Sequence, residues 1–235
     1  KMKLRIPTLL VVDHASNFIP ELYNNLGLKK SLINSHIAYD VNILKMSKKI
    51  GSLLDSRVIS AQYSRLIIDL NRGIEDPTLI PSISDKKIIP GNVLITKSNR
   101  TKRIKKIYNN YHLSIEKLIR IKKIKLIISM HSFNPVFKNN IRKVEIGILS
   151  NKDRRYSDLL IKNIKNKGFH IGDNDPYKGD LINDTMYKHG LKNNILHTLI
   201  EIRNDLINSE KKVNKISNLI AKSIKDIEKE ASKFL

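Results

Sequence analysis

The chain has 235 residues, and its 44 Lys and Arg against 22 Asp and Glu make the formal net charge +22. This length is typical of one domain, residues 1–235, and a hydrophobic content of 40% is enough for a buried core. The absence of cysteine excludes disulfides and thiolate metal sites. No apolar run approaches the roughly 20 residues of a membrane span, so we expect a cytoplasmic protein without a membrane partner.

Strong positive charge is typical of proteins that bind nucleic acid or an anionic surface. Here, however, the lysines are spread in ones and twos along the whole chain. No compact basic block alternates with aromatic residues, as single-strand binders usually show. We therefore interpret the charge as a property of the solvated surface, which attracts anionic substrates at long range, and we do not expect nucleic acid as a partner.

Short apolar runs alternate with amphipathic segments along the chain. A continuous apolar run predicts a strand buried on both faces, and apolar residues three and four positions apart predict a helix. In chain order, the predicted strands are 9–12, 57–61, 64–72, 125–130, 144–149, 169–172 and 195–203, and the predicted helices are 41–54, 99–123, 153–167 and 211–235. Residues 73–87 and 173–177 are predicted surface loops. This alternation indicates an α/β fold, a three-layer α/β/α sandwich around a mostly parallel or mixed sheet.

Polar residues follow several of these strands, at the sheet edge where open α/β folds hold their ligands. His14 follows the first strand and His131 follows strand 125–130, so the two imidazoles could converge on one metal ion. A carboxylate such as Glu201 could take a proton from metal-bound water. Guanidinium groups could bind a substrate carboxylate as a bidentate fork. Spacing alone leaves structural roles open for both histidines, for Arg72 as a bridge between surface carboxylates and for Glu201 as a partner of Arg203.

These polar residues belong to segments that together resemble the N-formylglutamate amidohydrolase family, over nearly the whole chain from residue 11 to about 206. Several specific segments in the right order make the resemblance far stronger than any one of them. The segments are Asp-His-Ala-Ser-Asn-Phe-Ile-Pro (13–20), His-Ile-Ala-Tyr-Asp (36–40), Tyr-Ser-Arg-Leu-Ile-Ile-Asp-Leu-Asn-Arg (63–72), Ile-Pro-Gly-Asn (89–92), Tyr-His (111–112), His-Ser-Phe-Asn-Pro (131–135), Asn-Asp-Pro-Tyr (174–177) and Glu-Ile-Arg-Asn-Asp-Leu-Ile (201–207).

The resemblance implies a fold similar to the zinc carboxypeptidases, with one Zn²⁺ per chain held by His14 and His131. Asn17 stands where the wider group has an acidic ligand. The third ligand is therefore open among the Asn17 amide oxygen, Asp13, Asp40 and water. The remaining implied roles are Glu201 as general base, and Asn71 and Arg72, helped by Arg65, as the site for a substrate carboxylate.

The implied activity is metal-dependent hydrolysis of the amide bond of a small N-acyl amino acid such as N-formylglutamate. The alternative is a non-catalytic protein on the same scaffold, in which the neutral Asn17 marks a decayed metal site. Such a protein would bind an anionic ligand or nucleic acid through Arg65, Arg72 and its basic surface. The sequence leaves the acyl group, the amino acid and the oligomeric state open.

Overall fold

A six-stranded sheet forms the centre of the computed structural model, which describes residues 2–235. The strands lie in the order β2-β1-β5-β10-β8-β9. All neighbouring strands pair in parallel except β8 and β10, which are antiparallel, so the sheet is mixed. The strands are β1 (Thr8–Val12), β2 (Arg57–Ser60), β5 (Leu126–Phe133), β8 (Ile146–Leu149), β9 (Ile171–Asp173) and β10 (Leu196–Arg203).

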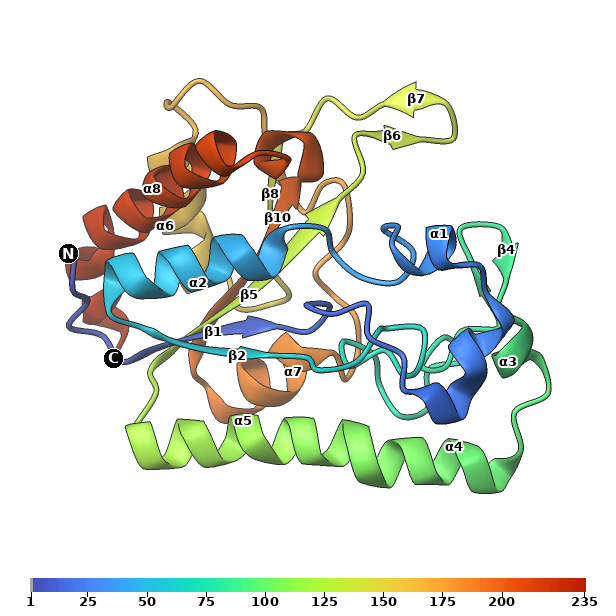
Figure 1. The fold of residues 1–235 in the computed structure, drawn as a ribbon. Coiled ribbons are helices and arrows are strands. Elements are labelled where there is room, and N and C mark those ends of the chain that lie inside the picture. The colour runs from blue at the N-terminus through green and yellow to red at the C-terminus, as the bar shows by residue number, and fades with distance from the viewer. Residues whose placement is uncertain (1) are drawn as a thin grey trace.

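Helices cover both faces of the sheet, which confirms the predicted three-layer α/β architecture (Figure 1). One layer contains α2 (Ile43–Leu54), α6 (Arg155–Ile164) and α8 (Glu210–Asp226), and α2 packs against α8. The opposite layer contains α5 (Asn109–Lys122) and α7 (Thr185–His189). The shorter helices are α1 (Lys30–Ile33), α3 (Pro90–Val93), α4 (Lys97–Arg103) and α9 (Glu228–Ala231).

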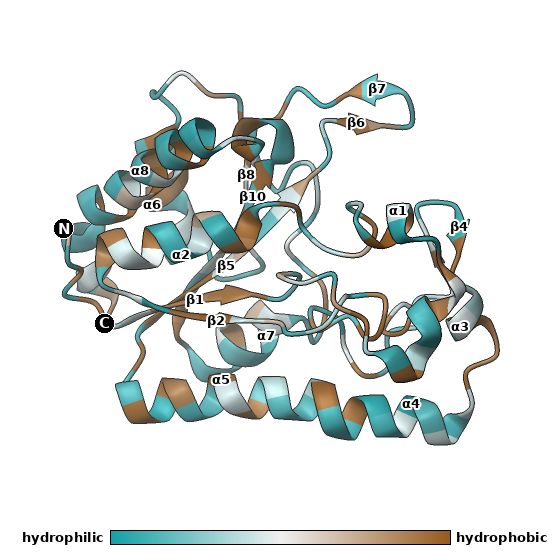
Figure 2. Ribbon diagram, in the orientation of Figure 1, coloured by the Kyte–Doolittle hydropathy of each residue, from teal (hydrophilic) through white to brown (hydrophobic). Residues whose placement is uncertain are grey.

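Burial explains why the apolar runs form the sheet. All five residues of β1 are buried, and Figure 2 shows this strand as hydrophobic along its length. The helices instead place an apolar stripe on the sheet, as α2 does with Met46, Ile50 and Leu54, which are fully buried. The strands are therefore fixed between two helical layers, and the carboxyl ends of the four parallel strands β2, β1, β5 and β10 lie together at one edge.

The predicted strand 64–72 is wrong, because these residues form a series of turns instead. Leu66, Ile67 and Ile68 are as buried as strand residues, but side chains rather than a neighbouring strand donate to the carbonyls of Leu66 and Ile67. The amide of Asn92 donates to the carbonyl of Leu66, and Arg103 donates to the carbonyl of Ile67. An apolar run reports burial, and it does not report which groups pair with its backbone.

Two small hairpins and several helix boundaries also differ from the prediction. β3 (Ile83–Ser84) pairs with β4 (Lys87–Ile88) in the predicted loop 73–87, and β6 (Val136–Phe137) pairs with β7 (Asn140–Ile141) after β5. The predicted helix 99–123 is α4 and α5 joined by a π-helical segment, Ile104–Tyr108. Within residues 2–235, each helix is too short or too polar to cross a bilayer.

Candidate active site

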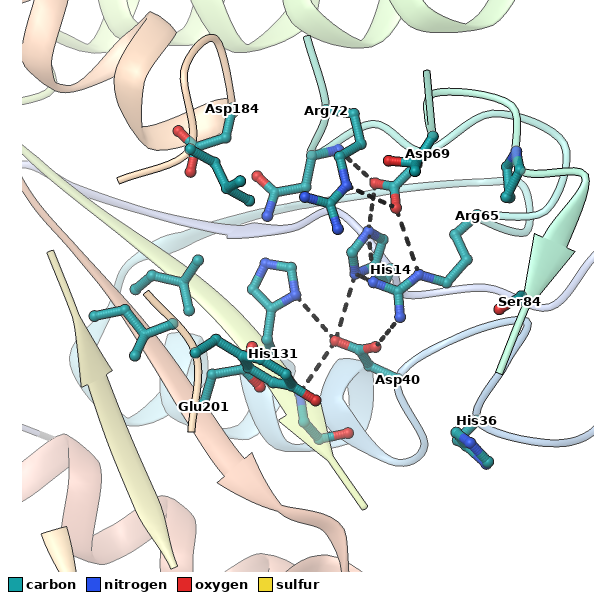
Figure 3. Close-up of a pocket in the computed structure, with 18 of the residues that line it drawn as sticks. His14, His36, Asp40, Arg65, Asp69, Arg72, Ser84, His131, Asp184 and Glu201 are labelled. Carbon is teal, nitrogen blue, oxygen red and sulfur yellow. Dashed lines mark hydrogen bonds and ion pairs between the residues drawn. The ribbon is translucent and has the colours of Figure 1, made fainter. Parts of the chain in front are cut away.

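A cavity of about 660 Å³ opens at the carboxyl ends of β1, β5 and β10 (Figure 3). His14 stands two residues after β1, and His131 and Glu201 lie near the ends of β5 and β10. All three side chains are buried at the floor of this pocket. Of the residues predicted for the site, the pocket is lined by His14, Arg65, Asn71, Arg72, His131 and Glu201.

Asp40 joins the two histidines into a cluster that could hold a metal ion. One potential ligand atom from each of His14, Asp40 and His131 lies within 4.8 Å of the others. Oδ2 of Asp40 is 3.6 Å from Nδ1 of His14 and 3.0 Å from Nδ1 of His131. The backbone N–H of Ser132 also donates to this oxygen, at 3.1 Å, and fixes the carboxylate in place.

The second nitrogen of each imidazole faces another buried carboxylate. Nε2 of His14 is 2.7 Å from Oδ1 of Asp69, and Nε2 of His131 is 3.4 Å from Oδ2 of Asp13. Because an ionised carboxylate only accepts hydrogen bonds, the contact with Asp69 requires a proton on Nε2 of His14, and Nδ1 of His14 accepts from the guanidinium of Arg65. Metal-bound histidines commonly have such a carboxylate on the second nitrogen, where it fixes the tautomer and the ring orientation.

This donor set fits zinc. Catalytic zinc is commonly held by histidine nitrogens and a carboxylate, and tetrahedral ligand distances near 2.0 Å place the donor atoms about 3.3 Å apart. The two distances between Asp40 and the Nδ1 atoms fall on either side of that value. Three buried carboxylates, those of Asp13, Asp40 and Asp69, contact the two imidazoles. Burial raises the pKa of Asp13, but its hydrogen bond and ion pair with His131 outweigh this and lower the pKa to about 2.

Asn17 lies outside this cluster. Its amide donates to Oδ1 of Asn34 at 3.0 Å in an exposed position, and Asn17 does not line the pocket. The structure thus places Asp40 beside the histidines, and Asp40 was one of the ligands that the sequence left open. Asp40 follows His14 by 26 positions, so no short motif links the two residues in the sequence.

Glu201 faces the cluster from the neighbouring strand. It is in register with His131, because β5 and β10 pair in parallel. Its Oε2 is buried and has no hydrogen-bond partner among residues 2–235. Burial raises the pKa of Glu201 to about 7, although the neighbouring His131 opposes the shift. On the side away from β5, Glu201 pairs with Gly147 of β8. A Cβ atom at Gly147 would lie 2.5 Å from the backbone oxygen of Asp175, which is closer than a Cβ atom can approach.

The three residues predicted to bind a substrate carboxylate differ in the contacts that they make within the protein. The guanidinium of Arg65 folds onto the cluster, with hydrogen bonds to Asp40 and to His14. Arg72 is half-exposed, and its Nε is 3.9 Å from Oδ2 of Asp69. Oδ1 of Asn71 accepts from the backbone N–H of Thr185 at 3.1 Å, which fixes the orientation of the Asn71 amide in the pocket wall.

The buried carboxylates of Asp13 and Asp69 organise the site, and spacing did not assign them this role. Asp13 accepts hydrogen bonds from Tyr111 at 3.0 Å, Ser129 at 3.1 Å and Thr185 at 2.9 Å. These partners come from α5, β5 and α7. A signal was present in the sequence, since Asp13 directly precedes His14 at the end of a buried strand.

The family model for N-formylglutamate amidohydrolase matches residues 6–208, which is most of the chain. The chain belongs to the N-formylglutamate amidohydrolase family. It is therefore an amidohydrolase by family, and the resemblance seen in its sequence is confirmed. No curated protein matches the sequence significantly.

Two solved structures share the fold of this chain. The gene product Atu2144 from Agrobacterium tumefaciens is 31% identical, with a TM-score of 0.88 over 96% of this chain and 93% of that chain. An N-formylglutamate amidohydrolase from Ralstonia eutropha JMP134 is 15% identical, with a TM-score of 0.69 over 98% of this chain and 95% of that chain. At that identity, the second likeness shows the family fold alone.

Proposed function

We propose that this protein is a zinc-dependent amidohydrolase that cleaves the amide bond of a small N-acyl amino acid, such as N-formylglutamate. One observation carries the proposal: His14, Asp40 and His131 converge at the floor of a pocket, with the unpaired carboxyl oxygen of Glu201 facing them. The family supports amide hydrolysis. The metal and the substrate are inferred from the donor atoms and from the charges of the pocket.

His14, Asp40 and His131 would hold the ion, and Asp69 and Asp13 would orient the two imidazoles from behind. A zinc ion held there would supply Lewis-acid chemistry, which lowers the pKa of water toward 7 and polarises an amide carbonyl. Arg65 contributes positive charge beside Asp40 and so limits the repulsion among the buried carboxylates.

Glu201 would accept the proton of the attacking water and return it to the leaving nitrogen. Its position suits both steps, because its buried Oε2 faces the cluster and has no hydrogen-bond partner among residues 2–235. Its burial also keeps bulk water from competing for the proton. The products would be a carboxylic acid and a free amino acid, which are formate and glutamate when the substrate is N-formylglutamate.

Arg72 and Asn71 would bind the carboxylate of the amino-acid portion. Arg72 is half-exposed and its contact with Asp69 is long, so its guanidinium can turn toward a ligand. A guanidinium fork and an amide N–H₂ group are both donors that suit a carboxylate. Arg65 is less available for this role, because it already contacts His14 and Asp40.

Elemental analysis and a hydrolysis assay on the same sample test the proposal. We expect about one zinc per chain and release of amino acid from N-formylglutamate or another N-acyl amino acid. Zinc-loaded protein that hydrolyses no member of such a panel would contradict the proposal. Metal-free protein with RNA binding that falls steeply with salt would instead support the non-catalytic alternative.

A further inference from the structure

The pocket extends well beyond the groups that the proposed reaction needs. In Figure 3, Arg72 and Asp184 lie on one side of the metal-binding cluster, and His36 and Ser84 lie on another side, beyond Asp40 and Arg65. The end near His36 and Ser84, which we call the distal end, is lined by His36, Ile37, Pro81, Ile83, Ser84 and Asp85. A substrate carboxylate at Arg72 would place its amide at the cluster and its acyl group toward the distal end.

The size of the cavity exceeds what a formyl group requires. Pockets of roughly 300–1,000 Å³ hold drug-sized ligands, and this cavity has about 660 Å³. A formyl group adds a single carbon to the amino acid, and it would end at the cluster. The distal end would then remain filled with water.

The distal end is built from two segments that contact each other. Nε2 of His36 is 3.3 Å from a carboxylate oxygen of Asp85, in the turn between β3 and β4. This contact ties the loop before Asp40 to the β3–β4 hairpin. Next to the paired residues, Ile37 and Ile83 line the pocket, and Ile83 supplies most of the exposed apolar surface because Ile37 is buried. Ile83 is 62% exposed, so an apolar ligand there would remove substantial apolar surface from water.

We infer that the enzyme accepts N-acyl amino acids with an apolar acyl chain of several carbons, and that this chain lies against Ile37 and Ile83 at the distal end. The inference rests on the proposed function, because it takes the amide to lie at the cluster and the carboxylate at Arg72. Within residues 2–235, no lysine or arginine lines this wall, and Nε2 of His36 already contacts Asp85. The apolar pair and the available length therefore favour an alkyl chain over a charged group.

A series of N-acyl glutamates tests the inference with the zinc-loaded protein. The acetyl, butanoyl, hexanoyl and octanoyl compounds have amides of similar intrinsic reactivity, so their kcat/KM values report binding of the chain. Each methylene that becomes buried raises kcat/KM up to about fourfold. We expect the hexanoyl compound to exceed the acetyl compound by about tenfold or more. Values that stay level or fall along the series would overturn the inference.

The β3–β4 hairpin supplies a matched pair of variants. Ile83 and Ile88 are cross-strand partners with exposed fractions of 62% and 63%, but only Ile83 lines the pocket. Ile83→Ser should lower the ratio of hexanoyl to acetyl kcat/KM by about threefold to tenfold, because it removes apolar contact from the chain. Ile88→Ser should leave that ratio at the wild-type value. Equal ratios in both variants and wild type would remove Ile83 from the subsite.

The outcomes separate this inference from the proposed function. Hydrolysis of N-formylglutamate without any gain along the alkyl series would overturn the inference and leave the amidohydrolase proposal standing. No hydrolysis of any compound, by protein that contains zinc, would overturn both. Thermal unfolding of both serine variants should match the wild type, because both positions are exposed, and this control excludes a folding defect.

Discussion

Replacing Glu201 with Gln separates the chemistry of this residue from its effect on stability. The substitution keeps the shape of the side chain and removes its charge and its ability to carry a proton. We expect kcat to fall by about 10²- to 10⁴-fold, which is the usual contribution of a general base, while zinc remains bound. In the metal-free protein, the same substitution should raise the free energy of unfolding at alkaline pH.

The magnitude follows from the pKa of Glu201, which burial raises from 4.5 to about 7. A shift of this size corresponds to about 3 kcal/mol between the protonated and ionised forms. Because the folded-state pKa is raised, the favourable contribution of Glu201 is present below pH 4.5 and is lost as the pH rises through 7. Gln cannot ionise, so its advantage over Glu should grow across this window to about 3 kcal/mol at pH 8.5.

Urea unfolding at pH 5 and pH 8.5, with zinc removed, measures this difference. We expect a gap below about 1 kcal/mol at pH 5, and at pH 8.5 an increase of about 1 M or more in the urea midpoint. Glu210→Gln is the control, because the side chain of Glu210 is 74% exposed on the surface. The reasoning is refuted if Glu201→Gln and Glu210→Gln show the same pH dependence, or if Glu201→Gln keeps wild-type kcat.

Three further predictions concern the metal and the carboxylate site. Zinc at a concentration of about 100 times its Kd should raise the free energy of unfolding of the chelator-treated protein by about 2.7 kcal/mol. Unfolding curves that are the same with and without zinc would argue against a native metal site. Asp13→Asn should weaken zinc binding by about 10- to 100-fold, because it removes the carboxylate that contacts Nε2 of His131. A competition titration with a chromophoric chelator measures this change. An unchanged zinc affinity would show that Asp13 does not orient His131 for metal binding. Arg72→Ala should raise KM for N-acyl amino acids by about tenfold or more, and a substrate whose carboxylate is replaced by an amide should show no such increase.

The α/β layers could be predicted because short apolar runs alternate with amphipathic segments along the chain. β1 and β5 were recognisable from the buried apolar runs 9–12 and 126–128, and β10 was predicted as well, although His197, Thr198 and Glu201 are buried within it. The same rule failed at 64–72, where an equally apolar run is buried without strand pairing. Its backbone partners, Asn92 and Arg103, lie on segments that the sequence does not link to it.

By itself, the sequence determined the family, the sheet-and-helix layers and the residues at the strand ends, including His14, His131 and Glu201. These features depend on local patterns and on short motifs. Only the tertiary structure decided that Asp40 stands beside the histidines while Asn17 faces Asn34, and that Asp13 and Asp69 support the imidazoles from behind. The physical reason is that a metal-binding cluster is a set of distances among side chains brought together by folding, and separation along the chain does not encode those distances.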